Sequence, residues 1–346
     1  LAVASGAAAV TYALQNIVQA GDHIVAADNL YGGSFNLITH TLSTQGVTNT
    51  IVNVNDLEAL EAAIQPNTKV VYAETFGNPN SDVTNLEVVA EVAHRHNIPF
   101  IVDNTFGTPF LIRPIEHGAD VVVHSATKYL NGHGDVIAGF VVGKADFIGE
   151  VRMFGLKDMT GAVMDPFSAF LILRGLKTLE IRMQKHCANA KAIAEYLDKH
   201  PAVEKVYYPG LKNHVGHDIA ARQMKDFGGM LSFEVKGGRA AGTKLVNALH
   251  LITVAVSLGD AETLIEHPAS MTHSTYTEEE LAASGIAAGL IRLSVNRTYR
   301  GKLTKQERER FVKMKQHIES NRHFYEKDLD YCTVCGHKKP EYMNRK

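Results

Sequence analysis

Short apolar runs alternate with stretches of helical spacing through the first part of the chain. The apolar runs are His23–Ala26, Thr50–Val54, Val70–Glu74, Phe100–Val102, Val121–His124 and Gly139–Val142. The stretches with helical spacing are Ala7–Gln19, Leu57–Ile64 and Leu86–His96. Apolar runs without polar alternation, separated by helices, are typical of strands that are buried on both faces of a parallel sheet. The sequence therefore predicts an α/β fold with a mainly parallel sheet.

The pattern changes twice along the rest of the sequence. From Pro166 it becomes helical, with a long helix expected over residues 179–200, and a smaller α/β section then extends to Val295. We expect a large domain over residues 1–178 and a smaller C-terminal domain over residues 179–295. Residues 296–346 carry an excess of Lys and Arg, whereas the preceding sequence carries an excess of Asp and Glu. We interpret this last segment as an atypical basic tail.

The composition of the chain limits the classes of protein to which it can belong. The 346 residues have a formal net charge of -2, which gives no support for binding to nucleic acid or to a membrane. No apolar run reaches the roughly 18 residues of a membrane-spanning helix. Three cysteines in a chain of this length fit a reducing compartment, so we expect a cytoplasmic protein. The chain opens at Leu1 inside an apolar stretch, without an initiator methionine, and we interpret it as a fragment.

Polar side chains follow two neighbouring runs of the expected sheet. Asp103 follows the fourth run, and the segment Ser125-Ala126-Thr127-Lys128 follows the fifth. Ligands of open parallel sheets bind beyond the carboxyl ends of the strands. The carboxylate and the lysine could form a simple ion pair. The two hydroxyls indicate a second interpretation, in which they hold a phosphate while Lys128 forms a Schiff base with an aldehyde and Asp103 pairs with a ring nitrogen.

Two further features fit such a ligand. The text SGAAA opens the first expected helix, so the N–H groups of Gly6 and Ala7 are available to a phosphate. An ordinary N-cap formed by Ser5 is the alternative. Tyr31 lies in the Gly-rich text DNLYGGSF. It belongs either to a surface turn or to an aromatic lid that stacks on a flat cofactor and moves a proton.

A series of motifs resembles those of the Cys/Met-metabolism family of pyridoxal-phosphate (PLP) enzymes. They are SGAAA, DNLYGGSF, ETFGNPN, VDNTFGTPF, HSATKYLNGHGDV, VSLGD, HPASMTHS and LIRLSV. The resemblance extends from Leu1 to Val295. It implies the PLP-dependent aminotransferase-like fold (fold type I), with a large PLP-binding domain and a smaller C-terminal α/β domain. The segment Gly155–Met164 most resembles the methionine γ-lyase branch of the family.

The resemblance implies a role for each matching residue. Lys128 would carry the cofactor, and Tyr31 would stack on its ring and protonate the leaving group. The implied cofactor-binding residues are Gly6, Ala7, Tyr31, Asn78, Asp103, Ser125, Thr127 and Lys128. Ser257 and Arg292 would bind the substrate carboxylate, for which the planar fork of an arginine is suited. No metal is implied.

The implied reaction is the α,γ-elimination of L-methionine to methanethiol, 2-oxobutanoate and ammonia. Methionine γ-lyases usually carry a cysteine two residues after the stacking tyrosine, and here that residue is Gly33, as in other members. Cystathionine γ-lyase or O-acetylhomoserine sulfhydrylase activity therefore stays open. A catalytically dead fragment that only binds PLP or pairs with other subunits is an alternative of another class. The resemblance further implies a homotetramer, built as a dimer of dimers that share active sites.

The two ends of the chain depart from the family pattern. The family's N-terminal segment, which supplies a Tyr and an Arg to the neighbouring subunit, is not found before Leu1. After Val295 the text NRTYRGKLTKQERERF replaces the family ending. Cys332 and Cys335 in this tail resemble half of a zinc ribbon, but structural zinc needs four ligands and no second pair is present. We therefore expect no metal site.

Overall fold

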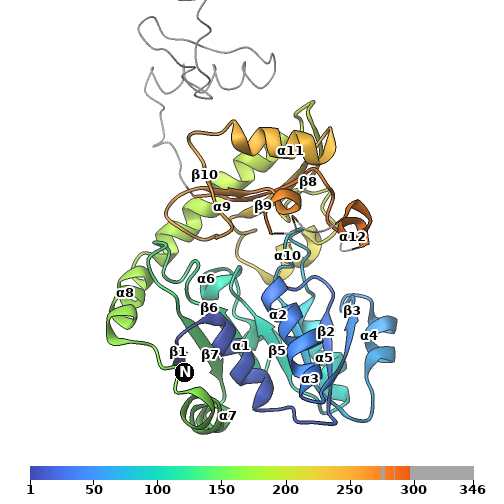
Figure 1. The fold of residues 1–346 in the computed structure, drawn as a ribbon, viewed down its shortest axis with the longest axis vertical. Helices are drawn as coiled ribbons and strands as arrows, with labels where there is room; N and C mark the ends of the chain where they lie inside the picture. The colour runs from blue at the N-terminus through green and yellow to red at the C-terminus, as the bar shows by residue number, and fades with distance from the viewer. Residues whose placement is uncertain (273, 275–276, 284, 297–346) are drawn as a thin grey trace, which may run out of the picture.

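The computed structural model describes residues 1–296 except residues 273, 275, 276 and 284. The chain is built on two sheets, which lie one above the other along the long axis of the molecule (Figure 1). The predicted basic tail, with Cys332 and Cys335, lies outside the described residues. In the part that the structure describes, no helix is both long and apolar enough to cross a membrane.

The larger sheet has seven strands in the order β1-β7-β6-β5-β4-β2-β3. The strands are β1 (Ala2–Val3), β2 (His23–Ala27), β3 (Thr48–Val52), β4 (Thr68–Glu74), β5 (Phe100–Asp103), β6 (Val121–Ser125) and β7 (Gly139–Gly143). Strands β2 to β6 pair in parallel, whereas β7 and β1 are antiparallel to their neighbours. The α/β fold with a mainly parallel sheet is thus confirmed. Because β4, β5 and β6 run in parallel, their carboxyl ends meet at one edge, where the predicted cofactor residues lie.

Eight α-helices accompany the larger sheet among the described residues. They are α1 (Gly6–Gln15), α2 (Gly32–Asn36), α3 (Leu42–Thr44), α4 (Leu57–Ala63), α5 (Leu86–Arg95), α6 (Thr108–Leu111), α7 (Ala145–Val151) and α8 (Pro166–Leu176). Side-chain caps fix where several of them begin. Ser5 accepts a hydrogen bond from the backbone N–H of Ala8 at 3.0 Å, and Asp165 accepts one from Phe167 at 2.9 Å ahead of α8. The N-cap of α1 places its first N–H groups beside the end of β6.

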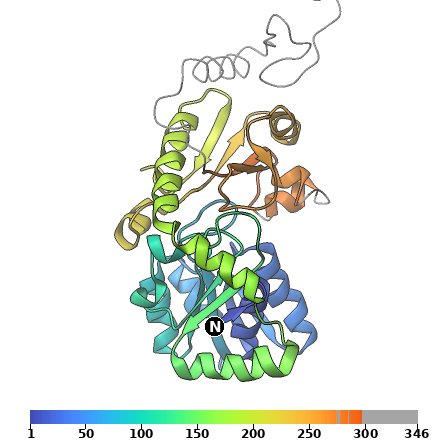
Figure 2. The same cartoon turned by 90° about the vertical axis from the view of Figure 1, so that its left-hand side faces the viewer.

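The smaller sheet has five strands in the order β10-β11-β12-β9-β8. They are β8 (Val203–Tyr207), β9 (Met230–Val235), β10 (Thr253–Val254), β11 (Leu264–Glu266) and β12 (Leu290–Ser294). Only β10 and β11 pair in parallel. Its helices are α9 (Leu179–Leu197), α10 (His217–Gln223), α11 (Gly238–Asn247) and α12 (Glu278–Ala283), and α9 runs beside the sheet in Figure 2. The pairing of β11 with β12 in this sheet positions side chains of the candidate site.

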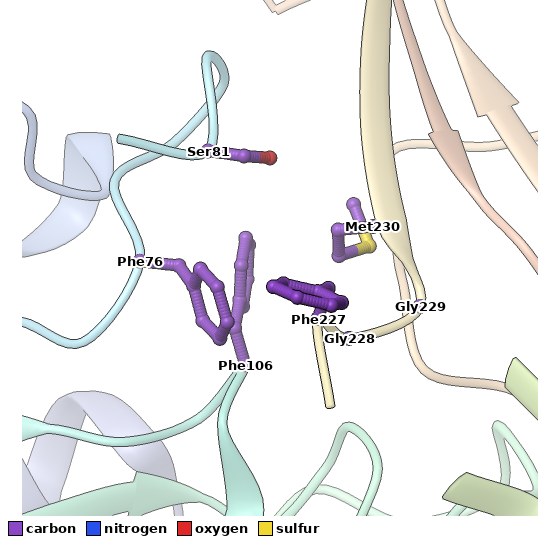
Figure 3. Close-up of a pocket in the computed structure, with 7 residues that line it drawn as sticks. All are labelled: Phe76, Ser81, Phe106, Phe227, Gly228, Gly229 and Met230. Atoms are coloured by element: carbon purple, nitrogen blue, oxygen red, sulfur yellow. The ribbon is translucent and has the colours of Figure 1, made fainter. Parts of the chain in front are cut away.

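The two sheets are joined by polar and aromatic contacts. The hydroxyl of Ser232 on β9 donates to the carbonyl of Pro79 at 2.6 Å. Close to this contact, Phe76 and Phe106 from the loops after β4 and β5 face Phe227 and Met230, which lie at the start of β9 (Figure 3). This apolar contact joins the loops after β4 and β5 to the start of β9. It therefore holds the smaller sheet next to the edge of the larger sheet where the predicted site residues lie.

Candidate active site

Lys128 lies in the turn that follows β6. Its backbone N–H donates to the carbonyl of Ser125 at 3.2 Å, which closes the turn and directs the side chain over the edge of the sheet. The ammonium donates a hydrogen bond to the hydroxyl of Ser257 at 3.1 Å. Burial lowers the pKa of Lys128, and the positive charge of Arg292 lowers it further. The structure thus brings together an amine of weakened basicity and two residues expected to bind substrate.

Asp103 is the last residue of β5, and its neighbour in the sheet is Glu74, the last residue of β4. Its carboxylate accepts hydrogen bonds from the backbone N–H of Thr105 at 2.9 Å and from its hydroxyl at 2.5 Å. Burial raises the pKa of Asp103 to about 6, although the bonds from Thr105 oppose the rise. The pKa of Glu74 is raised well above its usual value, first by burial and then by Asp103. Glu74 and Asp103 are therefore two neighbouring carboxyl groups in which burial disfavours the ionised form of each.

The start of α1 lies against the end of β6. A Cβ atom on Gly6 would lie 2.6 Å from the Cβ of Ser125, so only a glycine permits this approach. The hydroxyl of Thr127 donates to the carbonyl of Ala138 at 3.3 Å and accepts from its N–H at 3.0 Å. The N–H groups of Gly6 and Ala7 and the hydroxyl of Ser125 form a group of donors at one end of the site, whereas the O–H of Thr127 is directed to Ala138.

Arg292 lies in the middle of β12 and is buried. Its Nη1 donates to the side-chain oxygen of Asn78 at 3.2 Å, and its Nη2 donates to the carbonyl of Val256 at 2.9 Å. Nη2 also forms an ion pair with Glu266. The guanidinium is therefore held from three directions, and one of its partners is the residue next to Ser257. Asn78, Ser257 and Arg292 lie together, as the predicted site requires.

Tyr31 precedes α2, and its backbone N–H donates to Glu74 Oε1 at 2.7 Å. Its side chain is 58% exposed, so the ring is available to a ligand. Tyr31 also influences the pKa of Arg292: burial lowers that pKa, whereas Glu266 and the two tyrosines Tyr129 and Tyr31 raise it. A ring with this exposure is compatible with both the surface turn and the aromatic lid that the sequence allows.

These residues fit PLP by the chemistry of their donors and acceptors. Asp103 offers a buried carboxyl group to a pyridine nitrogen, and Lys128 offers an amine to an aldehyde. The donors around Gly6, Ser125 and Thr127 suit a phosphate. Among residues 1–296 with their gaps, no three His, Cys, Asp or Glu side chains are grouped so as to hold a metal ion.

Three residues of this constellation were not predicted from the sequence. Glu74 closes an apolar run and could have been found as a buried acid at a strand end next to Asp103. Thr105 was signalled by its place two residues after an aspartate, where a hydroxyl and an N–H reach back to the carboxylate. Glu266 has no such local signal, because its contact with Arg292 depends on the pairing of β11 with β12.

Several known proteins are similar to this chain over most of its length. Residues 1–297 match the family model described as Cys/Met metabolism PLP-dependent enzyme. The chain is 59% identical over 292 residues to the L-methionine gamma-lyase of Porphyromonas gingivalis, which covers 84% of this chain and 73% of that protein. It is 58% identical over 297 residues to the L-methionine gamma-lyase of Treponema denticola, with 85% and 74% covered.

A solved structure agrees with these relatives. The crystal structure of cystathionine gamma-lyase from Lactobacillus plantarum, complexed with L-serine, superposes with a TM-score of 0.81 at 44% sequence identity. The match covers 85% of this chain and 77% of that one. A likeness of this extent confirms the fold that was expected from the sequence motifs.

Proposed function

Because the chain belongs to the Cys/Met metabolism PLP-dependent enzyme family, we propose that it is a carbon–sulfur lyase acting on L-methionine. With one molecule of water, methionine would give methanethiol, 2-oxobutanoate and ammonia. One observation carries the proposal: the amine of Lys128 reaches Ser257, while the adjacent Val256 is bound by Arg292. An amine that binds an aldehyde cofactor and a guanidinium that suits a carboxylate therefore face one loop. This pairing suits an α-amino acid, and the named activity of the two relatives favours methionine.

We propose the following residues for the cofactor. Lys128 would bind the aldehyde of the cofactor, and Asp103 would pair with its ring nitrogen. Asn78 would lie beside the ring. The N–H groups of Gly6 and Ala7 and the hydroxyls of Ser125 and Thr127 would hold the phosphate. When bound, PLP supplies an electron sink that stabilises negative charge on the substrate carbon atoms next to the amino group.

Side chains of this chain would carry out the remaining steps of the reaction. Arg292 and Ser257 would orient the substrate by its carboxylate, which fixes the proton on Cα relative to Lys128. Lys128 would then take that proton, a role for which its lowered pKa is suited. A second proton would leave Cβ, and the electron pair of that C–H bond would expel the thiolate from Cγ. Tyr31 would give a proton to the sulfur as the thiolate leaves. Its ring is exposed on the open side of the site, where the end of the substrate side chain would lie.

Cystathionine γ-lyase and O-acetylhomoserine sulfhydrylase activities are the alternatives that Gly33 keeps open. A Cβ atom at this position would lie 2.5 Å from Cε1 of Tyr31, so residue 33 touches the group proposed to protonate the sulfur. Without a thiol here, discrimination between sulfur amino acids depends on the rest of the pocket.

The proposal is tested by the products formed from methionine, cystathionine and O-acetylhomoserine by purified protein with added PLP. Methanethiol and 2-oxobutanoate in equal amounts from methionine, with the highest kcat/KM of the three, would support it. A higher kcat/KM for either of the other substrates would replace methionine as the substrate. Protein that shows the visible absorption of bound PLP but acts on none of them would be the non-catalytic module.

Lys128→Ala tests the cofactor residue directly. We expect this variant to lose both the visible band and the adduct that borohydride traps on one lysine of the wild-type protein. Lys157→Ala, at an exposed lysine paired with Asp158, is the matched control and should keep both. A trapped adduct on one specific residue of the Lys128→Ala protein would contradict the assignment.

We also propose that the chain self-associates, up to a dimer of dimers. Support comes from exposed apolar side chains on and beside α8, which include Phe167, Phe170, Leu173 and Ile181. Sedimentation velocity of the purified chain tests this, and a monomer at micromolar concentration would contradict it. The division at residue 178 into a cofactor domain and a smaller domain is supported by the separate sheets of residues 2–143 and 203–294. A cytoplasmic location is supported by the low number of cysteines.

A further inference from the structure

Glu266 is a buried carboxylate that the proposed reaction does not use. It is the last residue of β11, and its direct partner across the antiparallel ladder is Arg292 on β12. Both side chains lie on the same face of the sheet and form an ion pair. Glu266 is 1% exposed, so its charge is compensated by Arg292 rather than by water.

The carboxylate of Glu266 is itself fixed. Its Oε1 accepts a hydrogen bond from the hydroxyl of Thr272 at 2.5 Å, while Oε2 faces Nη2 of Arg292. Its backbone is held in the ladder between β11 and β12. Glu266 therefore has little freedom to move away when a ligand arrives, and its contact with Arg292 is a fixed element of the site.

The contacts of Arg292 determine which of its N–H donors stay available to a ligand. Nη2 donates a hydrogen bond to the carbonyl of Val256 and forms the ion pair with Glu266. Nη1 gives one hydrogen to Asn78. The second hydrogen of Nη1 and the N–H of Nε have no acceptor among these contacts. An arginine side chain carries several rotatable bonds, so a guanidinium without Glu266 would lose the contact that selects this orientation.

From this geometry we propose that Glu266 is a positioning residue for substrate binding. It holds the guanidinium of Arg292 in the orientation that receives the substrate carboxylate, and it acts on the substrate through Arg292. The inference rests on the proposed function in taking an α-amino acid as the substrate. It does not depend on which sulfur amino acid is preferred, because methionine, cystathionine and O-acetylhomoserine all present the same carboxylate.

The test compares Glu266→Ala, Glu266→Gln and Thr272→Val in the PLP-loaded enzyme. We expect Glu266→Ala to raise KM for the best substrate about 10-fold or more, with kcat within about 3-fold, because the guanidinium of Arg292 would lose the buried charged partner that selects its orientation. Glu266→Gln keeps an acceptor oxygen and should restore part of the loss. Thr272→Val removes the hydrogen bond that supports Glu266 and should raise KM by a smaller factor.

Two further measurements separate positioning from a merely structural effect. The inhibition constant of 3-(methylthio)propylamine, which has the amine and thioether of methionine but no carboxylate, should stay within about 2-fold of wild type in all three variants. Thermal unfolding should show that Thr272→Val remains folded even if Glu266→Ala does not. Glu278→Gln, at an exposed carboxylate that pairs with Arg239, is the matched control and should leave every constant unchanged.

Specific outcomes would overturn the inference. If KM for the substrate stays within 2-fold in Glu266→Ala and in Thr272→Val, Glu266 does not position Arg292. If the inhibition constant of the carboxylate-free amine rises as much as KM, Glu266 supports the site as a whole rather than the carboxylate contact. A wild-type enzyme that acts on cystathionine but not on methionine would refute the proposed substrate, while the Glu266 comparison would still be made with cystathionine.

Discussion

The ammonium of Lys128 donates a hydrogen bond to the hydroxyl of Ser257 at 3.1 Å, across 129 positions of the chain. The neighbouring carbonyl of Val256 accepts a hydrogen bond from Arg292 at 2.9 Å. A single loop after β10 thus carries the contacts of both cationic side chains of the site. This loop couples the larger sheet, which supplies Lys128, to the smaller sheet, which supplies Arg292.

The charge of Arg292 should tune the basicity of Lys128. Burial lowers the pKa of Lys128 first, and Arg292 is the next cause, because a nearby positive charge disfavours the ammonium form. Arg292→Gln should therefore raise that pKa, so that less of the neutral amine is present at a given pH. The rate at which cofactor-free protein binds added PLP should then reach half its maximum at higher pH than in wild type.

The control for this measurement is Arg113→Gln, an exposed arginine that pairs with Glu116 and should leave the pH profile in place. An Arg292→Gln profile that coincides with that of wild type, or shifts to lower pH, would contradict the lowering of the Lys128 pKa by Arg292.

Asp103 should destabilise the cofactor-free protein at neutral pH. Its pKa is raised from 3.8 to about 6, so the folded state binds more protons than the unfolded state between these values, and stability falls as pH rises through them. Asp103→Asn removes this loss. We expect its free energy of unfolding at pH 7 to exceed that of wild type by up to about 3 kcal/mol, since one pKa unit corresponds to about 1.4 kcal/mol.

Urea unfolding at pH 4 and pH 7 measures this difference, and PLP affinity should change in the opposite direction because the partner of the ring nitrogen is lost. Asp158→Asn at an exposed aspartate serves as the control. An Asp103→Asn protein that is no more stable at pH 7 than wild type would contradict the raised pKa of Asp103. One that binds PLP equally well would contradict the placement of Asp103 at the cofactor.

The convergence of Asp103 and Lys128 was predictable from the sequence because it depends on one rule. Parallel strands place their carboxyl ends at one edge of the sheet. The apolar runs that correspond to β5 and β6 were clear from the order of apolar residues along the sequence. Glu74 follows the same rule, although the sequence analysis did not single it out. The boundaries of these strands agree with the predicted runs to within a residue or two.

The other half of the site was not accessible to the same reasoning. Strands β10 and β11 have two and three residues, too few for any periodic pattern. Arg292 and Ser257 were identified by resemblance to a family, because reading Arg292 alone favours an ordinary ion pair. The partner that orients it, Glu266, depends on the register between two strands separated by a long connection, and single-sequence patterns carry no information on that register.

Gly33 should influence which sulfur amino acid is preferred. Its added Cβ would lie 2.5 Å from the ring of Tyr31, which is exposed enough to move aside. Gly33→Cys places a polarizable thiol beside the proposed proton donor for sulfur, and we expect the ratio of kcat/KM for methionine to that for cystathionine to rise. One pocket group is typically worth about 1–3 kcal/mol of discrimination. Gly33→Ala displaces the ring without adding sulfur, and an equal rise in that variant would assign the effect to Tyr31 alone.

Gly259 should be required for the approach of the Ser257 loop to Lys128. It has a φ of +73°, and a Cβ atom here would lie 2.6 Å from the backbone nitrogen of Tyr129 and 3.1 Å from the carbonyl carbon of Lys128. Gly259→Ala must therefore displace either the loop or the backbone that carries the cofactor lysine. We expect PLP affinity to fall about 10-fold or more, in addition to the roughly 1–2 kcal/mol that a left-handed conformation costs a residue with a side chain.

Gly161 separates these two effects, because it has a φ of +68° but no atom within 4 Å of an added Cβ. Gly161→Ala should lose a similar stability from its backbone conformation and keep wild-type PLP affinity. Both variants are compared by thermal unfolding of the cofactor-free protein and by PLP titration followed at the visible band. Equal PLP affinities of Gly259→Ala and Gly161→Ala would mean that the loop adapts to the added methyl group. The close contact between Gly259 and the Lys128 turn would then have no part in holding the cofactor lysine in place.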